Sequence, residues 1–188
     1  MIQDSKFKLG AKELRVSDPT KEQLTSIKRR EVYIVCDNVL DTYNIGSIFR
    51  LADAVAAKCI YLCGQSETPP NSRIAKASVG TDKWVPWQHF ASAKAAIENL
   101  KFKIPKRIFD ESKSENLKII AVEQGKKSID FRKADYSEPI AFIVGNETEG
   151  VSKEALKMAD EIIEIPMFGV NRSLNVMVSL AIVLYRAI

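Results

Sequence analysis

Histidine, cysteine and long apolar runs are all scarce in this sequence. It contains one histidine and three cysteines in 188 residues, and no Cys/His spacing is typical of a zinc site, so we expect no bound metal. The cysteines, Cys36, Cys59 and Cys63, are odd in number and lie beside apolar runs, which favours buried, reduced thiols. His89 has no nucleophile near it in the sequence and is therefore a poor catalytic candidate.

A targeting or membrane-spanning segment is not visible either. No charged start leads into an apolar stretch, and no apolar run approaches the roughly 20 residues needed to cross a bilayer. We therefore expect a cytoplasmic protein with no membrane partner. Its length and its hydrophobic content of 46% are sufficient for one compact domain without disulfides or metals.

The excess positive charge is concentrated at the N-terminus. Residues 1–30 contain 8 Lys and Arg and 4 Asp and Glu, whereas residues 31–188 contain 20 of each. We expect residues 1–30 to form a basic N-terminal extension and residues 31–188 to form the main domain. Basic side chains suited to phosphate contacts are Lys6, Lys8, Lys12, Arg15, Lys28, Arg29 and Arg30 and, farther on, Lys101, Lys103, Lys106 and Arg107. Taken singly, each such run is more often plain solvated surface.

From residue 31 onward, short β-branched runs alternate with longer helical segments. This alternation is typical of an α/β domain with a mainly parallel sheet and flanking helices. The pattern predicts strands at 32–36, 59–63, 118–122, 140–144 and 161–165, and helices at 45–57, 91–100, 152–159 and 174–187. Turn formers in 64–87 predict a loop with short ordered pieces, and 101–116 is expected to add a helix or flap.

Three segments contain residues that could bind a ligand or take part in catalysis. The first runs from Asn44 to Arg50 and reads NIGSIFR. Asn44 is suited to cap a helix whose first turn includes Gly46. Backbone N–H groups of that turn would then face an anion, with Arg50 about two turns along. Taken alone, the segment reads equally well as an ordinary capped helix.

The second segment, residues 143–152, reads IVGNETEGVS and runs from an apolar strand through a GxExxG loop into a helix. Gly145 and Gly150 permit close approach of the backbone to a ligand. Glu147 falls at the carboxyl edge of the sheet, where open α/β folds bind small molecules. The loop is neither a GxGxxG nor a P-loop, which disfavours ordinary dinucleotide or nucleotide binding. A plain turn with a solvated glutamate is the alternative.

The third segment, residues 165–176, reads IPMFGVNRSLNV and leads into the final helix. That helix is apolar nearly all round, so it is predicted to be buried in a core or against another subunit. Capping of the helix accounts for Ser173 but leaves Asn175 unexplained.

Together these segments resemble a known family. NIGSIFRLADA, IVGNETEGVS and IPMFGVNRSLNV are similar to three ordered motifs of the SpoU (TrmH-type) branch of the SPOUT RNA 2′-O-ribose methyltransferases, and KASVGTDKWVPW resembles a further family segment. The likeness extends from about Val32 to Ile188. It implies an α/β domain with a deep C-terminal trefoil knot, S-adenosylmethionine as cofactor, RNA as substrate and a homodimer that buries the last helix.

The resemblance also implies residue roles. Arg50 would activate the ribose 2′-hydroxyl. Because a guanidinium hardly ever loses its proton, it would act by stabilising the developing oxyanion and clamping phosphate as much as by accepting a proton. The polar residues that complete the catalytic site would be Asn44, Glu147, Ser173 and Asn175. The positions that hold the cofactor would be Val122, Gly145, Ile165, Ser173 and Leu174.

Several substrates and functions stay open. The chain shows neither the N-terminal RNA-binding domain common in members that act on ribosomal RNA nor the extension of many tRNA-specific members, and we expect tRNA rather than rRNA. A non-catalytic RNA-binding protein is disfavoured by the joint presence of the polar residues. A base-nitrogen methyltransferase is a further alternative. Trp84 and Trp87 are expected to pack their loop onto the domain, with stacking on RNA bases as the alternative.

Overall fold

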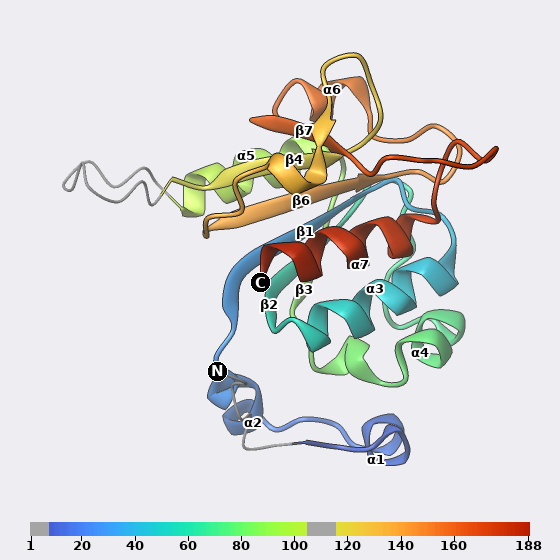
Figure 1. Cartoon of the computed structure of the whole chain (residues 1–188). Helices are drawn as coiled ribbons and strands as arrows, with labels where there is room; N and C mark the ends of the chain where they lie inside the picture. The colour runs from blue at the N-terminus through green and yellow to red at the C-terminus, as the bar shows by residue number, and fades with distance from the viewer. Residues whose placement is uncertain (1–7, 105–115) are drawn as a thin grey trace.

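A parallel sheet forms the centre of the computed structural model, which describes residues 8–104 and 116–188 (Figure 1). Within them, seven strands run in the order β3-β2-β1-β6-β4-β7-β5, and every neighbouring pair is parallel. The strands are β1 (Arg30–Asp37), β2 (Ala57–Cys63), β3 (Trp87–Phe90), β4 (Lys118–Val122), β5 (Ile129–Asp130), β6 (Ile140–Gly145) and β7 (Glu161–Glu164). The expected α/β class with a mainly parallel sheet is confirmed.

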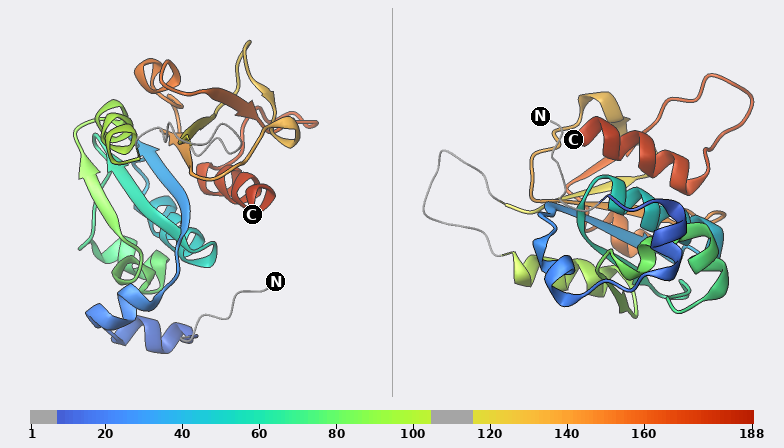
Figure 2. Two further views of the ribbon diagram at one scale, coloured as in Figure 1. Left: turned by 90° about the vertical axis from the view of Figure 1, so that its left-hand side faces the viewer. Right: turned by 90° about the horizontal axis from the view of Figure 1, so that it is seen from below.

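Helices cover both faces of this sheet (Figures 1 and 2). On one face lie α3 (Thr42–Ala54), α4 (Ser72–Ser78) and α7 (Val176–Ala187). On the other lie α5 (Ala93–Lys103) and α6 (Lys153–Leu156). Two short helices, α1 (Ala11–Val16) and α2 (Lys21–Ser26), precede β1 and lie at one end of the molecule.

Strand β1 explains why the central strands read as continuous apolar runs. Its residues Val32, Ile34 and Cys36 pack in the cluster that includes α3 and α7, whereas Tyr33 and Val35 pack with α5 and α6. Successive side chains of a strand point to opposite faces, so a strand covered on both faces must be apolar throughout.

All five predicted strands are present, with ends within a few residues of the expected ones. The edge strands β3 and β5 were not predicted. β3 carries two exposed residues in its pattern WQHF, and β5 has two residues, so neither leaves an apolar signature. The predicted loop at 64–87 contains α4 and a 3₁₀ turn at Thr81–Lys83 as its ordered pieces.

Two capping predictions are wrong. α3 is capped by Asp41, whose Oδ1 accepts a hydrogen bond from the backbone N–H of Tyr43 at 2.7 Å, and Asn44 lies inside the helix. α7 is capped by Asn175, whose Oδ1 accepts from the N–H of Met177 at 2.9 Å, and Ser173 precedes the helix. Asp, Asn and Ser are similarly good caps, so local preference could not distinguish the correct one.

The expectations for the rare residues are confirmed. Cys36, Cys59 and Cys63 are buried and free. Trp84 is 4% exposed and packs inside the domain. The Nε2 atom of His89 lies 3.1 Å from the carbonyl oxygen of Gly64, which is a structural contact. Within the described residues, no helix is long and apolar enough to cross a membrane.

Two of the proposed phosphate-binding arginines are used inside the protein instead. The guanidinium of Arg29 donates to the carbonyl oxygens of Trp84 at 2.5 Å and Ala57 at 3.2 Å. Arg30 forms an ion pair with Glu138. Both arginines therefore connect the N-terminal segment to the sheet, and in this structure their guanidinium groups already have partners within the protein.

The other basic candidates divide into three groups. Lys6, Lys106 and Arg107 lie outside the described residues, as does most of the predicted helix or flap at 101–116. Lys101 donates to the carbonyl oxygen of Met158 at 3.4 Å. The side chains of Lys8, Lys12, Arg15, Lys28 and Lys103 are exposed, so they are available to a partner.

Gly46 sets the distance between α3 and α4. A Cβ built on this buried glycine would lie 2.5 Å from the Cβ of Ala77 and 2.7 Å from the carbonyl oxygen of Ile74. Only hydrogen at this position lets the two helices approach so closely. Gly46 therefore serves helix packing, and it is the place where α4 fixes the helix that carries Asn44 and Arg50.

We expect Gly46→Ala to lower the free energy of unfolding by about 1–3 kcal/mol, because the clash with α4 outweighs the better helix propensity of alanine. Gly125→Ala is the matched control, since a Cβ there meets nothing within 4 Å. Urea unfolding monitored by circular dichroism measures both. Equal stability of the two variants would contradict this role of Gly46.

Candidate functional site

A cavity opens at the carboxyl edge of the sheet, where β4, β6 and β7 end. Its volume is about 450 Å³, within the range of sites for small organic ligands. In a parallel sheet all strands finish at the same edge, so segments far apart in the sequence meet there. The turns after these three strands supply most of the lining.

All five positions assigned to the cofactor by resemblance line this cavity. They come from the end of β4, the end of β6 and the segment between β7 and α7: Val122, Gly145, Ile165, Ser173 and Leu174. The structure therefore brings together residues up to about fifty positions apart in the sequence.

The GxExxG loop is closed tightly on itself. Asn146 and Gly150 exchange two backbone hydrogen bonds, of 3.0 and 2.9 Å. Gly150 has a φ of +71°, which favours glycine, and a Cβ on Gly145 would lie 2.1 Å from the backbone carbon of Gly150. Both glycines are thus required for the turn itself, and the turn directs Glu147 toward α3.

Glu147 is the centre of a hydrogen-bond network. Its Oε1 accepts from the Nδ2 of Asn44 at 2.9 Å and from the N–H of Asp41 at 3.1 Å, and its Oε2 accepts from the N–H of Leu40 at 3.1 Å. The Nδ2 of Asn175 donates to the Oδ1 of Asn44 at 2.9 Å. Three of the five polar residues named from the sequence therefore form one connected chain.

The network also determines the charge of Glu147. Partial burial raises the pKa of its carboxyl group, but hydrogen bonds from Asn44 and from the backbone at Leu40 and Asp41 lower it by more. The pKa is consequently below its ordinary value of 4.5. Glu147 is a fixed negative charge at neutral pH.

Arg50 and Ser173 are less closely joined to this network. Arg50 lies six residues beyond Asn44 on α3, about 120° around the helix axis, and its side chain is exposed. It does not line the cavity, and within residues 8–104 and 116–188 its guanidinium has no hydrogen-bond or ion-pair partner. Ser173 lines the cavity, and its N–H donates to the Oδ1 of Asn171 at 3.3 Å.

Sequence reasoning missed two residues at the end of β4. The carboxylate of Glu123 accepts from the N–H of Val151 at 2.8 Å and of Gln124 at 2.9 Å, and Gln124 donates to the carbonyl oxygen of Arg172 at 2.6 Å. They connect β4 to the other two loops of the cavity. Their position directly after a predicted strand was the available signal.

Comparison with known proteins identifies the fold and the family. Residues 31–185 match the SpoU rRNA Methylase family, which is most of the chain. The chain belongs to the SpoU methyltransferase family. Its members are S-adenosylmethionine-dependent RNA 2′-O-methyltransferases, so the expected family is confirmed.

The curated relatives of this SpoU protein include tRNA (guanosine(18)-2′-O)-methyltransferases. The protein of Aquifex aeolicus is 34% identical over 161 residues, covering 85% of this chain and 70% of the relative. The protein of Escherichia coli strain K12 is 29% identical over 168 residues, covering 88% of this chain and 66% of the relative.

Solved structures match along nearly the whole chain. The A. aeolicus TrmH/SpoU tRNA modifying enzyme superposes with a TM-score of 0.71 at 30% identity, covering 94% of this chain and 80% of that one. An AdoMet-bound rRNA methyltransferase from Sinorhizobium meliloti superposes with a TM-score of 0.72 at 27% identity, covering 93% of this chain and 59% of that one. These matches confirm the knotted α/β fold class of the SpoU methyltransferases.

The network around Glu147 predicts a pH-dependent stability. A lowered folded pKa means that the contribution of Glu147 is present above its ordinary pKa and is lost as the pH falls through the folded value. Because the side chain of Glu147 is exposed and its interactions are screened by solvent, we expect Glu147→Gln to lower the free energy of unfolding by less than about 1 kcal/mol at pH 7, with a difference from wild type that shrinks below pH 4.5. Urea unfolding at several pH values measures it.

Glu149→Gln is the control for this experiment, because Glu149 lies two residues away and is exposed. Its effect should be small at every pH. If the Glu147→Gln difference stayed constant down to pH 3, the lowered pKa of Glu147 would be wrong.

Proposed function

We propose that this SpoU protein transfers a methyl group from S-adenosylmethionine to a ribose 2′-hydroxyl of RNA, with tRNA as its substrate. The observation that carries the proposal is the Glu147–Asn44–Asn175 network beside a cavity of cofactor size. The curated relatives named as tRNA 2′-O-methyltransferases support the choice of tRNA. We assign the activity to the cytoplasm, where such RNA is available.

The cavity fits the methyl donor in size and in the chemistry of its lining. Val122, Gly145, Ile165 and Leu174 line it. We propose that their main-chain groups bind the nucleoside of the donor. When bound, the donor supplies an electrophilic methyl group on a positively charged sulfur. The protein must then hold the ribose oxygen in line with that methyl.

The polar network fixes the start of α3, the helix that carries Arg50. Glu147 accepts from the amide nitrogen of Asn44 and Asn175 donates to its amide oxygen, so the amide of Asn44 has one orientation. Asn44 in turn fixes the first turns of α3, the helix that carries Arg50. The guanidinium of Arg50 stabilises the negative charge that develops on the 2′-oxygen and binds the neighbouring phosphate. Ser173, at the cavity wall, contacts the donor or the ribose.

A homodimer is part of this proposal. Several large apolar side chains next to the cavity and on α7 are exposed: Phe168 (92%), Val170 (103%), Leu174 (36%), Val178 (37%) and Tyr185 (58%). Large exposed apolar side chains of this kind are typical of a contact with another subunit. A second copy covering α7 would bury the remaining side of a helix that packs Leu180, Val183 and Leu184 against the core.

Residues 1–30 are proposed to act as a basic extension that contacts RNA. Lys12 and Arg15 are exposed on α1, and Lys8 and Lys28 flank the two short helices. Phosphate contacts from such residues would add affinity without sequence preference. The main domain would then begin close to β1.

We expect Arg50→Ala to reduce kcat by at least about 100-fold while S-adenosylmethionine affinity stays unchanged, because one stabilising donor is lost from the transition state. Transfer of a tritiated methyl group to tRNA, followed by alkaline hydrolysis, measures rate and position together. A 2′-O-methylated ribose resists alkaline cleavage at the modified step. Arg73→Ala, at an exposed arginine of α4, is the matched control.

Each alternative has its own outcome in this assay. Near-normal turnover of Arg50→Ala would remove Arg50 from catalysis. A label on an alkali-sensitive nucleotide would favour a base methyltransferase. Transfer to ribosomal RNA alone would show that the substrate is rRNA and not tRNA. Cofactor binding without transfer to any RNA would favour a non-catalytic RNA-binding protein.

For the dimer, we expect Val178→Asp to give a monomer at micromolar concentration in sedimentation velocity, where the wild type sediments as a dimer. A charge at an apolar contact opposes association, whereas an acidic residue in the first turn of α7 suits an isolated helix. Val16→Asp, at a valine that is 84% exposed on α1, should stay dimeric. A wild type that is monomeric at all concentrations would contradict the proposed dimer.

A further inference from the structure

The charged lining of the cavity has one sign. Four glutamates contribute to it, and within residues 8–104 and 116–188 no lysine, arginine or histidine does: Glu123, Glu147, Glu149 and Glu164. No group of three or more His, Cys, Asp and Glu in the described residues could hold a metal ion, so these carboxylates are spread around the wall.

Three of the four carboxylates are held in place by donors of the protein. Glu123 accepts from the N–H groups of Val151 and Gln124. Glu147 accepts from Asn44 and from two backbone N–H groups. Glu164 accepts from the hydroxyl of Ser128 at 2.6 Å. The positions of these carboxylates are thus fixed before any ligand binds, so little free energy is lost in reorganising them when a ligand arrives.

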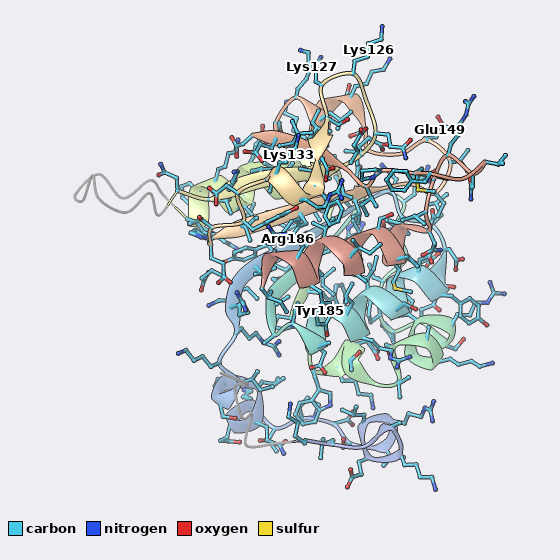
Figure 3. The ribbon with its side chains drawn as sticks, viewed as in Figure 1. Lys126, Lys127, Lys133, Glu149, Tyr185 and Arg186 are labelled. Carbon is cyan, nitrogen blue, oxygen red and sulfur yellow. The ribbon has the colours of Figure 1, made fainter. Side chains whose placement is uncertain are left out.

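The fourth carboxylate and two lysines of the loop between β4 and β5 lie on different parts of the surface. Glu149 is exposed on the loop between β6 and α6, while Lys126 and Lys127 extend outward from another loop (Figure 3). Neither lysine lines the cavity. A ligand in the cavity therefore meets carboxylates first, and their field is not cancelled at the wall.

We propose that these four glutamates make the cavity select the sulfonium donor over its thioether product. S-adenosylmethionine carries a sulfonium, an ammonium and a carboxylate group, and its net charge is +1. S-adenosylhomocysteine has lost the sulfonium charge with the methyl group, and its net charge is 0. The inference rests on the proposed function, because it takes this cavity as the cofactor site.

The size of the effect follows from screening. Partly exposed carboxylates several ångströms from a charge each change affinity by a small factor, about threefold, and salt reduces it. Together they attract the net positive charge of the donor, whereas the ammonium and carboxylate groups of the product largely offset each other in the same field, so the donor is bound more tightly than the product. The selectivity needs no contact that distinguishes the methyl group itself.

Isothermal titration calorimetry of the full chain tests this with three ligands. They are S-adenosylmethionine, S-adenosylhomocysteine and sinefungin, in which a protonated amine replaces the methylsulfonium. Glu149→Gln and Glu164→Gln keep the shape of the side chain and remove its charge. Glu98→Gln, on α5 across the sheet, is the matched control.

We expect Glu149→Gln and Glu164→Gln each to raise the dissociation constants of S-adenosylmethionine and sinefungin about threefold, with a clearly smaller change for S-adenosylhomocysteine. Glu98→Gln should change none of them. For the wild type, the preference for S-adenosylmethionine over S-adenosylhomocysteine should fall between 0.05 and 0.5 M salt, as expected when the Debye length shrinks from about 10 Å at 0.1 M.

Equal changes for all three ligands, or a preference that salt does not alter, would overturn the inference while leaving the cofactor site in place. A wild type that binds none of the three ligands would overturn the proposed function and the inference with it. The binding readout thus separates the two cases without any measurement of turnover.

Discussion

The orientation of one buried amide is the constraint on which the site depends. Asn44 is 7% exposed, receives a hydrogen bond from Asn175 and donates one to Glu147. These three residues belong to α3, the start of α7 and the loop after β6, so the network joins three separate segments of the chain. Since a buried polar group without a partner is costly, a shift of any one segment destabilises the other two. Helix α3 and the loops that line the cavity are therefore positioned as one unit.

Much of the fold could be predicted because its central strands are covered on both faces. Such strands leave continuous apolar runs, and β1, β2, β4, β6 and β7 were found from them. The edge strands β3 and β5 leave no such run, since part of each remains exposed. Helix starts failed for a different reason. Asp41 and Asn44 are comparable caps in isolation. In the structure Asp41 caps α3, while the side chain of Asn44 is hydrogen-bonded to Glu147.

In the candidate site, too, some residues could be predicted from sequence motifs and others could not. The structure places Glu147, Asn175 and the five positions assigned to the cofactor by resemblance around one cavity, whereas Arg50 lies outside its lining. Glu123 and Gln124 were not found, because a polar residue after a strand is ordinary until the loops that it joins are known. Arg29 and Arg30 looked like phosphate ligands because their partners, Trp84 and Glu138, are far away in the sequence. Long-range pairing of this kind has no local signature.

The docking of Arg29 on the carbonyl groups of Trp84 and Ala57 has a mechanical consequence. Together with the ion pair between Lys83 and Asp18, it fastens the N-terminal arm to the turn before β3 at more than one point. These contacts hold residues 18–29 against the sheet. If α1 contacts RNA as proposed, that contact would lie at a fixed distance from the cavity.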